Sequence, residues 1–162
     1  MAQEKISFEQ FLVSTEESQH GFVQDLHSYM LDSGCKAAYE EKKTGLLGSY
    51  KHTKTKKSVI NVLLKKHGLL VRIYGESLDG YRGFLNTLPK EMVESIQGAG
   101  ICKRLAHDGC SPKCKGYDFT IGDEHFQKCR YNCFEFLVTQ SSAPFIKSFV
   151  EHEMEERKAA SA

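Results

Sequence analysis

The sequence predicts an α+β fold, in which helices and strands occupy separate stretches of one domain spanning 1–162. Helical periodicity marks residues 1–35 and 76–100, whereas short runs of β-branched and large apolar residues fill 36–75. Strand patterns return in the cysteine-rich part, 101–140, before a last helix. Because helices do not alternate regularly with strands, we expect a mixed or mostly antiparallel sheet.

Two helices are expected in the N-terminal part. Ser7 is a suitable N-cap for the amphipathic segment SFEQFLV, and Ser14 or Thr15 is the expected cap of the second helix. The second helix should end near Ser33, because Gly34 suits a left-handed C-cap. Its apolar face shows helical spacing and consists of Phe22, Leu26, Tyr29 and Met30.

The next part, 36–75, contains four strand-like runs. They are AAYEE, LLGSYKHT, SVINVLLKK and LLVRIYG. The last two are separated by a turn at His67 and Gly68, and we therefore predict that they form a hairpin.

The second half should contain helices on both sides of a hairpin. Pro89 suits the first position of the helix PKEMVESIQ, and glycines follow it. YDFTIGDEHF predicts two strands around Gly122, and CFEFLVT predicts another. Pro144 should open a closing helix at 143–158, whose polar tail, EHEMEERKAASA, is expected to fray.

The N-terminus and the composition favour a cytoplasmic protein. The segment MAQEKISFEQFLVSTEE has acids where a secretory signal needs basic and apolar residues, and no stretch has the apolar length of a membrane span. We therefore expect no membrane partner. Since cytoplasmic thiols are kept reduced, a cysteine cluster there favours metal binding or thiol chemistry over disulfides.

Five of the six cysteines follow the spacing C-x7-C-x3-C-x14-C-x3-C. Four thiolates are a preferred closed shell for structural zinc, so the sequence predicts a zinc site. Neighbouring lysines, including Lys128, would offset the negative charge of the thiolates. The predicted ligands are Cys110, Cys114, Cys129 and Cys133, with Cys102, His107 and His125 as alternates.

Other chemistry is open to the same cysteines. An iron-sulfur cluster is less favoured, because its usual short run would need another cysteine soon after Cys114. A thiol-dependent enzyme, or a redox or heavy-metal-responsive protein, would use one activated thiol with His107 or His125 as its base. Plain burial of small apolar side chains is a further interpretation, and it is the expected state of Cys35.

The cysteine spacing also resembles the twin-CX3C motif of the small mitochondrial intermembrane-space chaperones. In that family the two pairs form disulfides between two helices. This chain is longer, and the segment between its pairs is predicted as strand and turn. The resemblance is therefore one of spacing, and it covers these four cysteines only.

Positive charge is concentrated in one part of a nearly neutral chain. Residues 36–72 carry ten Lys and Arg against two acids, whereas the whole chain has a net charge of +1. Clustered lysines attract polyanions such as nucleic acid, although the absence of arginine from the segment YKHTKTKKS argues against base readout. Lysines on an exposed strand also prevent aggregation, and we favour that interpretation. The residues concerned are Lys51, Lys54, Lys56 and Lys57.

No sequence motif identifies a catalytic centre. The chain has no P-loop, dinucleotide fingerprint, nucleophile elbow or HExxH segment, so whether it is an enzyme stays open. GESLDGYRG has the polar mixture of a ligand pocket but also suits a turn, and His27 is a weak candidate base. The sequence therefore predicts a zinc-binding module for an unknown small molecule or protein partner.

Overall fold

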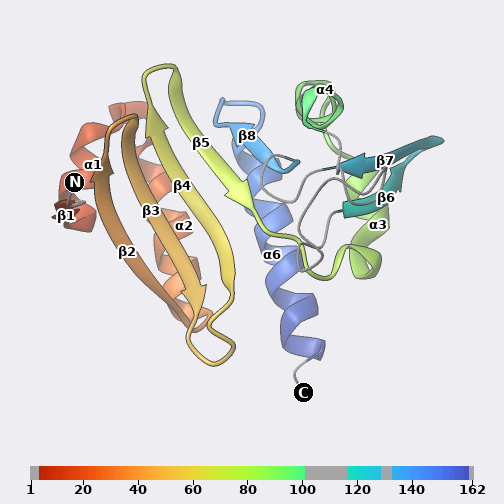
Figure 1. Cartoon of the computed structure of the whole chain (residues 1–162), viewed down its shortest axis with the longest axis horizontal. Coiled ribbons are helices and arrows are strands. Elements are labelled where there is room, and N and C mark those ends of the chain that lie inside the picture. Colours follow the sequence, from red (N-terminus) through yellow and green to blue (C-terminus); the bar gives the residue numbers. More distant parts are fainter. Residues whose placement is uncertain (1–3, 101–116, 129–132, 161–162) are drawn as a thin grey trace. The chain divides into compact units, whose positions relative to one another are not determined.

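Residues Met1–Ile73 form an antiparallel sheet that two helices cover on one face (Figure 1). The computed structural model describes residues 4–100, 117–128 and 133–160 of the chain. In this first unit the strands are neighbours in chain order, each antiparallel to the next. They are β1 (Glu4–Ile6), β2 (Cys35–Lys42), β3 (Gly45–His52), β4 (Ser58–Lys65) and β5 (Gly68–Ile73).

The helices of the first unit are α1 (Phe8–Ser14) and α2 (His20–Asp32). Ser7 caps α1 in a capping box with Gln10, as the sequence predicts for Ser7. The prediction that Ser14 or Thr15 caps α2 is wrong. The Thr15 hydroxyl donates instead to the carbonyl of Leu12, and a 3-10 turn at Glu17–Gln19 intervenes before α2. Gly34 ends the helical segment with a φ of +89°.

In the sheet of the first unit, a glycine on β3 leaves room for an aromatic ring of β2. Tyr39 of β2 lies opposite Gly48 of β3, and Gly48 lies opposite Val62 of β4. A Cβ on Gly48 would come within 2.4 Å of the Tyr39 ring. Glycine is required there because the ring fills the space that a larger residue would occupy.

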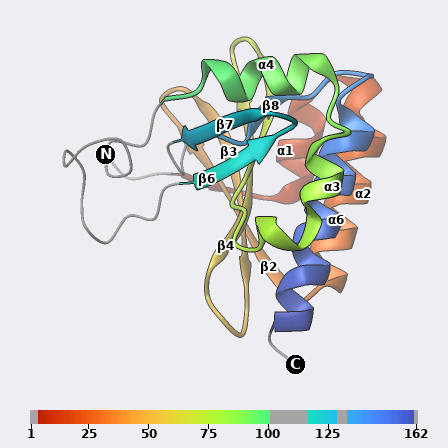
Figure 2. The ribbon, with the colours of Figure 1, turned by 90° about the vertical axis from the view of Figure 1, so that its right-hand side faces the viewer.

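Residues Tyr74–Ala162 form the second unit, which combines helices with a separate hairpin (Figure 2). As expected, strands β6 (Tyr117–Ile121) and β7 (Glu124–Lys128) pair around Gly122, and the φ of this glycine is +59°. The remaining elements are η2 (Leu78–Tyr81), α3 (Arg82–Leu85), α4 (Lys90–Gly98), β8 (Glu135–Leu137) and α6 (Ala143–Ala160). Pro89 is the N-cap of α4 and not its first residue, so the helix begins one residue later than predicted, at Lys90.

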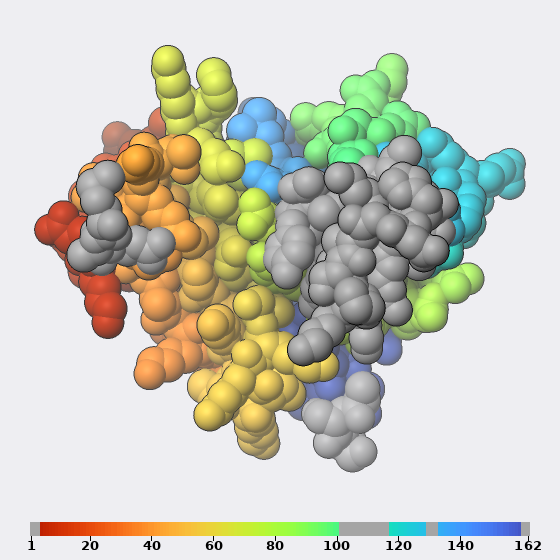
Figure 3. Space-filling view, in the orientation of Figure 1, coloured from red at the N-terminus to blue at the C-terminus, as the bar shows by residue number. Residues whose placement is uncertain are grey.

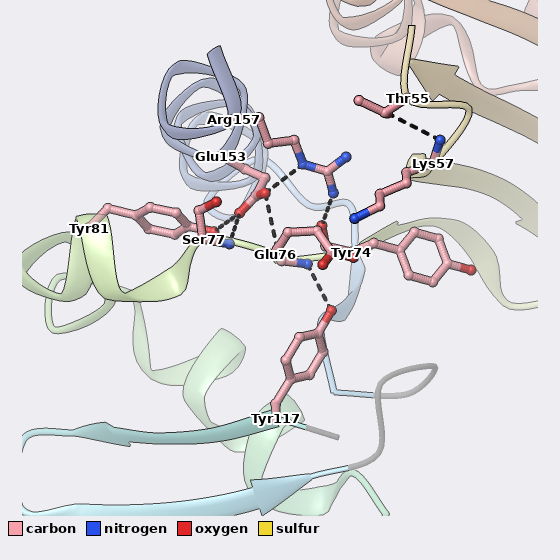
Figure 4. Close-up of polar contacts among 10 residues, drawn as sticks. Thr55, Lys57, Tyr74, Glu76, Ser77, Tyr81, Tyr117, Glu153 and Arg157 are labelled. Carbon is pink, nitrogen blue, oxygen red and sulfur yellow. Dashed lines mark hydrogen bonds and ion pairs between the residues drawn. The ribbon is translucent and has the colours of Figure 1, made fainter. Parts of the chain in front are cut away.

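The closing helix α6 does not fray where its sequence turns polar. Glu153, in the segment predicted to fray, is 0% exposed and binds the loop that starts the second unit (Figure 4). Its carboxylate accepts hydrogen bonds from the backbone N–H of Glu76 and of Ser77, from the Tyr81 hydroxyl and from Arg157. The guanidinium of Arg157 also donates to the carbonyl of Tyr74. The prediction failed because charged residues rarely mark a buried helix face.

The observed elements confirm the α+β class. The chain has N-terminal helices, mostly antiparallel pairing and a closing C-terminal helix, as the sequence predicts. The assignment to one domain stays a prediction. None of the helices in the described ranges is both long and apolar enough to cross a membrane.

Candidate functional site

Most of the predicted metal ligands lie outside the described residues. These are Cys102, His107, Cys110, Cys114 and Cys129. Cys133 and His125 are described, and both belong to the second unit. Within the described ranges, no group of three or more histidine, cysteine or acidic side chains is arranged to hold a metal ion.

The β6–β7 hairpin determines where the chain enters and leaves the cysteine-rich segment. Tyr117, the first residue of β6, pairs with Lys128, the last residue of β7. Paired Cα atoms in an antiparallel ladder are about 5 Å apart. In the sequence, Cys114 precedes Tyr117 by three residues and Cys129 directly follows Lys128. Both cysteine pairs are therefore connected to the same, open end of this hairpin.

Cys133 is held near that open end by its neighbour in sequence. Phe134 packs on Tyr117 at 4.8 Å between ring centroids and on Phe149 of α6 at 5.0 Å. Cys133 and Phe134 are both 0% exposed. The Tyr117 hydroxyl also accepts a hydrogen bond from the backbone N–H of Gly75 at 2.8 Å, which holds the start of β6 in place.

Lys128 is a buried cation at the same end of the hairpin. Its ammonium donates to the carbonyls of Gln97 and Ala99, at 3.0 and 2.9 Å, and lies 5.9 Å from the Phe126 ring centroid. These carbonyls belong to the C-terminus of α4, which has no basic residue in its last turn. Lys128 thus caps α4, a favourable position for a cation. Its partners in the described part of the chain carry no full negative charge.

His125 is oriented by a carboxylate on the exposed side of the hairpin. Its Nε2 lies 2.5 Å from Asp118, and the Gln127 amide donates to the other carboxylate oxygen. Hydrogen bonds from His125 and Gln127 hold the pKa of Asp118 below its usual range. A histidine bound to a carboxylate in this way can use its second nitrogen as a metal ligand or as a base.

A second polar cluster lies under α2 in the first unit, and the sequence indicates only one member of it. His27 Nδ1 lies 2.8 Å from the Tyr50 hydroxyl and 3.2 Å from that of Tyr39, and the two hydroxyls contact each other. Phe8 stacks on the imidazole at 3.8 Å. Burial lowers the pKa of His27, against the opposing charge of Glu9, and so favours the neutral ring.

The neutral imidazole determines the direction of these hydrogen bonds. Its Nδ1 has one lone pair, which accepts from the nearer hydroxyl, that of Tyr50, while Tyr39 donates to Tyr50. Burial raises the pKa of Tyr39 to about 12 and that of Tyr50 further, so both stay protonated donors. The proton of His27 is then on Nε2. The two tyrosines are 11 residues apart in sequence and lie on neighbouring strands, so composition does not reveal the contact between their hydroxyls.

The predicted polyanion-binding lysines are exposed around the turn between β3 and β4. Lys51 lies at the end of β3, and Lys54, Lys56 and Lys57 follow in the turn. The chain matches no protein-family model, and comparisons with curated proteins and with solved structures found no similar protein.

Proposed function

We propose that the chain is a zinc-binding module in which Cys110, Cys114, Cys129 and Cys133 hold a structural metal ion. Four thiolates suit zinc, and their two C-x3-C pairs are the starting point of this proposal. The observation that supports it most is the position of the open end of the β6–β7 hairpin, to which both cysteine pairs are connected in sequence.

The surroundings of that end support a negatively charged centre. Cys133 is buried beside Phe134, whose ring contacts Tyr117. Lys128 is a buried ammonium with uncharged described partners, and a four-thiolate zinc site carries excess negative charge that such a cation offsets. The metal would anchor the hairpin and order a surface for a small molecule or a protein partner.

Metal content and thiol protection test the proposal together. The full chain is purified without oxygen or chelator, zinc is measured by elemental analysis, and free thiols are counted before and after unfolding with chelator. We expect about one zinc per chain and at least five thiols that react only after unfolding with chelator, namely the four zinc ligands and the buried Cys35. Absence of metal together with freely reactive thiols would contradict the proposal.

A matched pair of variants tests the ligand assignment. Cys133→Ser should lose zinc, because it removes one of four ligands. Cys35→Ser should keep zinc, because Cys35 is also buried but belongs to β2. Retention of zinc by Cys133→Ser and its loss on substituting Cys102 would move Cys102 into the ligand set.

The thiol-enzyme alternative is favoured by one observation, the pairing of His125 with Asp118. In thiol enzymes the catalytic base is often an imidazole that a third group orients, and His125, four residues before Cys129, is oriented by a carboxylate. In that case one cysteine should alkylate much faster than the others, and His125→Asn should slow it. Equal protection of all four thiols would exclude this alternative.

A further inference from the structure

Five lysines gather at one end of the sheet in the first unit. Lys36 of β2 lies directly opposite Lys51 of β3, although fifteen residues separate them in sequence. All five are exposed, and Figure 3 shows the turn between β3 and β4, in gold, at the molecular surface. We call this group the lysine cluster. Its members are Lys36, Lys51, Lys54, Lys56 and Lys57.

The cluster carries positive charge that the described residues do not neutralise. Like charges directly opposite each other on neighbouring strands are destabilising, and Lys36 and Lys51 form such a pair. In the described part of the chain, Lys36, Lys51, Lys54 and Lys56 make no ion pair with a carboxylate. The nearby C-terminus of α2 contributes only about half a negative charge.

The turn that carries the cluster is held in a defined shape. The backbone N–H and the hydroxyl of Thr53 both donate to the carbonyl of Gly34 at 3.0 Å. The backbone N–H of Lys56 donates to the carbonyl of His52 at 2.7 Å. Lys56 has a φ of +60°, a left-handed conformation that glycine or asparagine adopts at lower cost. A lysine kept there despite the strain supports a function for its charge.

The side chains around the cluster narrow the class of partner. Tyr50, the aromatic residue of this stretch, is 1% exposed, so it offers no face on which a base could stack. The cluster contains no arginine to read base edges, and Thr53 and Thr55 offer no large apolar side chain for insertion into lipid. Lysine ammonium groups bind phosphates as point charges.

From these observations we infer that the lysine cluster binds the phosphate backbone of double-stranded nucleic acid without reading its bases. A duplex presents regularly spaced phosphates and keeps its bases stacked inside, which matches a surface of point charges without exposed aromatic rings. The inference does not depend on the zinc proposal, because the cluster lies within Met1–Ile73 and the cysteine pairs lie within 110–133.

Fluorescence anisotropy with labelled DNA and RNA duplexes of mixed sequence tests the inference over a series of salt concentrations. The wild-type chain should bind, with an affinity that falls steeply with salt. The test variant combines Lys36→Gln, Lys51→Gln, Lys54→Gln and Lys56→Asn. Each lost phosphate contact should reduce the magnitude of the slope of log K against log salt by about 0.9. The slope of the variant with all four substitutions should therefore be smaller in magnitude by up to ~3.6. Asparagine keeps the left-handed position of residue 56 accessible.

A control of equal charge uses lysines at the opposite end of the same sheet. It combines Lys42→Gln, Lys43→Gln, Lys65→Gln and Lys66→Gln, at the last residues of β2 and β4 and in the turns that follow them. This control should bind duplex like the wild type, and both variants should keep the wild-type circular dichroism spectrum and zinc content. Equal losses in both variants, no duplex binding by the wild type, or stronger binding to phosphatidylserine vesicles than to duplex would overturn the inference.

Discussion

The carboxylate of Glu153 illustrates how one residue organises a whole segment of the second unit. Its four hydrogen-bond donors come from the loop Glu76–Ser77, from Tyr81 and from Arg157 one turn further along α6. Burial and the adjacent charge of Glu153 raise the pKa of Tyr81 far above its usual range, so that its hydroxyl remains a donor.

Replacing Glu153 with glutamine should destabilise the protein by about 3 kcal/mol, because it removes the charge of a fully buried carboxylate and its ion pair with Arg157. Urea denaturation followed by circular dichroism measures this change. Glu155→Gln, an exposed position on the same helix, is the control and should shift the free energy of unfolding by less than about 0.5 kcal/mol. Similar effects of the two substitutions would show that the network does not stabilise the fold.

His27 should make stability depend on pH. Burial lowers its pKa in the folded state below the usual 6.5, so the unfolded chain binds its proton more readily. Its stabilising contribution is therefore complete above pH ~6.5 and is lost as the pH falls towards the folded-state pKa. His27→Gln should flatten this dependence in urea titrations between pH ~5 and ~8, whereas an unchanged profile would contradict the assigned role.

At the scale of elements, strand β3 requires its glycine, Gly48, whereas helix α2 does not require its own, Gly21. Gly48 lies beneath the Tyr39 ring, and a methyl group there would meet Cε1 at 2.4 Å. Gly48→Ala should therefore destabilise the fold by about 1–3 kcal/mol, since the ring must leave its place over the sheet. The measurement is the free energy of unfolding in urea.

Gly21 in α2 provides the comparison for the same chemical change. No atom lies within 4 Å of the position its Cβ would take. Because alanine favours helix over glycine, Gly21→Ala should stabilise the protein by up to about 1 kcal/mol. Equal destabilisation by both substitutions would show that steric contact with Tyr39 is not the cause.

For the molecule as a whole, local signals predicted most elements of the fold. Ser7, Gly34 and Gly122 each mark a cap or turn at which the sequence requires a particular backbone, and the structure has those features there. The short strand β1 was not predicted, because three residues show no reliable periodicity and the strand exists through its pairing with β2. The sequence therefore predicts those elements whose caps and turns depend on neighbouring residues, and it does not predict an element that depends on pairing with a distant strand.

The candidate sites were predictable only in part, for the same physical reason. The cysteine pairs and the run of turn lysines are close in sequence and visible there. Lys36 joins that run only through strand register, and Tyr39 and Tyr50 meet under α2 only after β2 and β3 have paired. The burial of Glu153 depends on a loop 76 residues away, which its own sequence neighbourhood does not indicate.

The long separation in sequence between Glu153 and its loop also has a consequence for the order of events during synthesis. Strands β2 to β5 each pair with the strand made just before, so the first unit can assemble as it leaves the ribosome. The loop Tyr74–Ser77 emerges next, but its carboxylate partner, Glu153, is translated 76 residues after Ser77. We therefore expect the second unit to complete its fold only after Glu153 has left the ribosome, which leaves this loop accessible to proteases and chaperones until then.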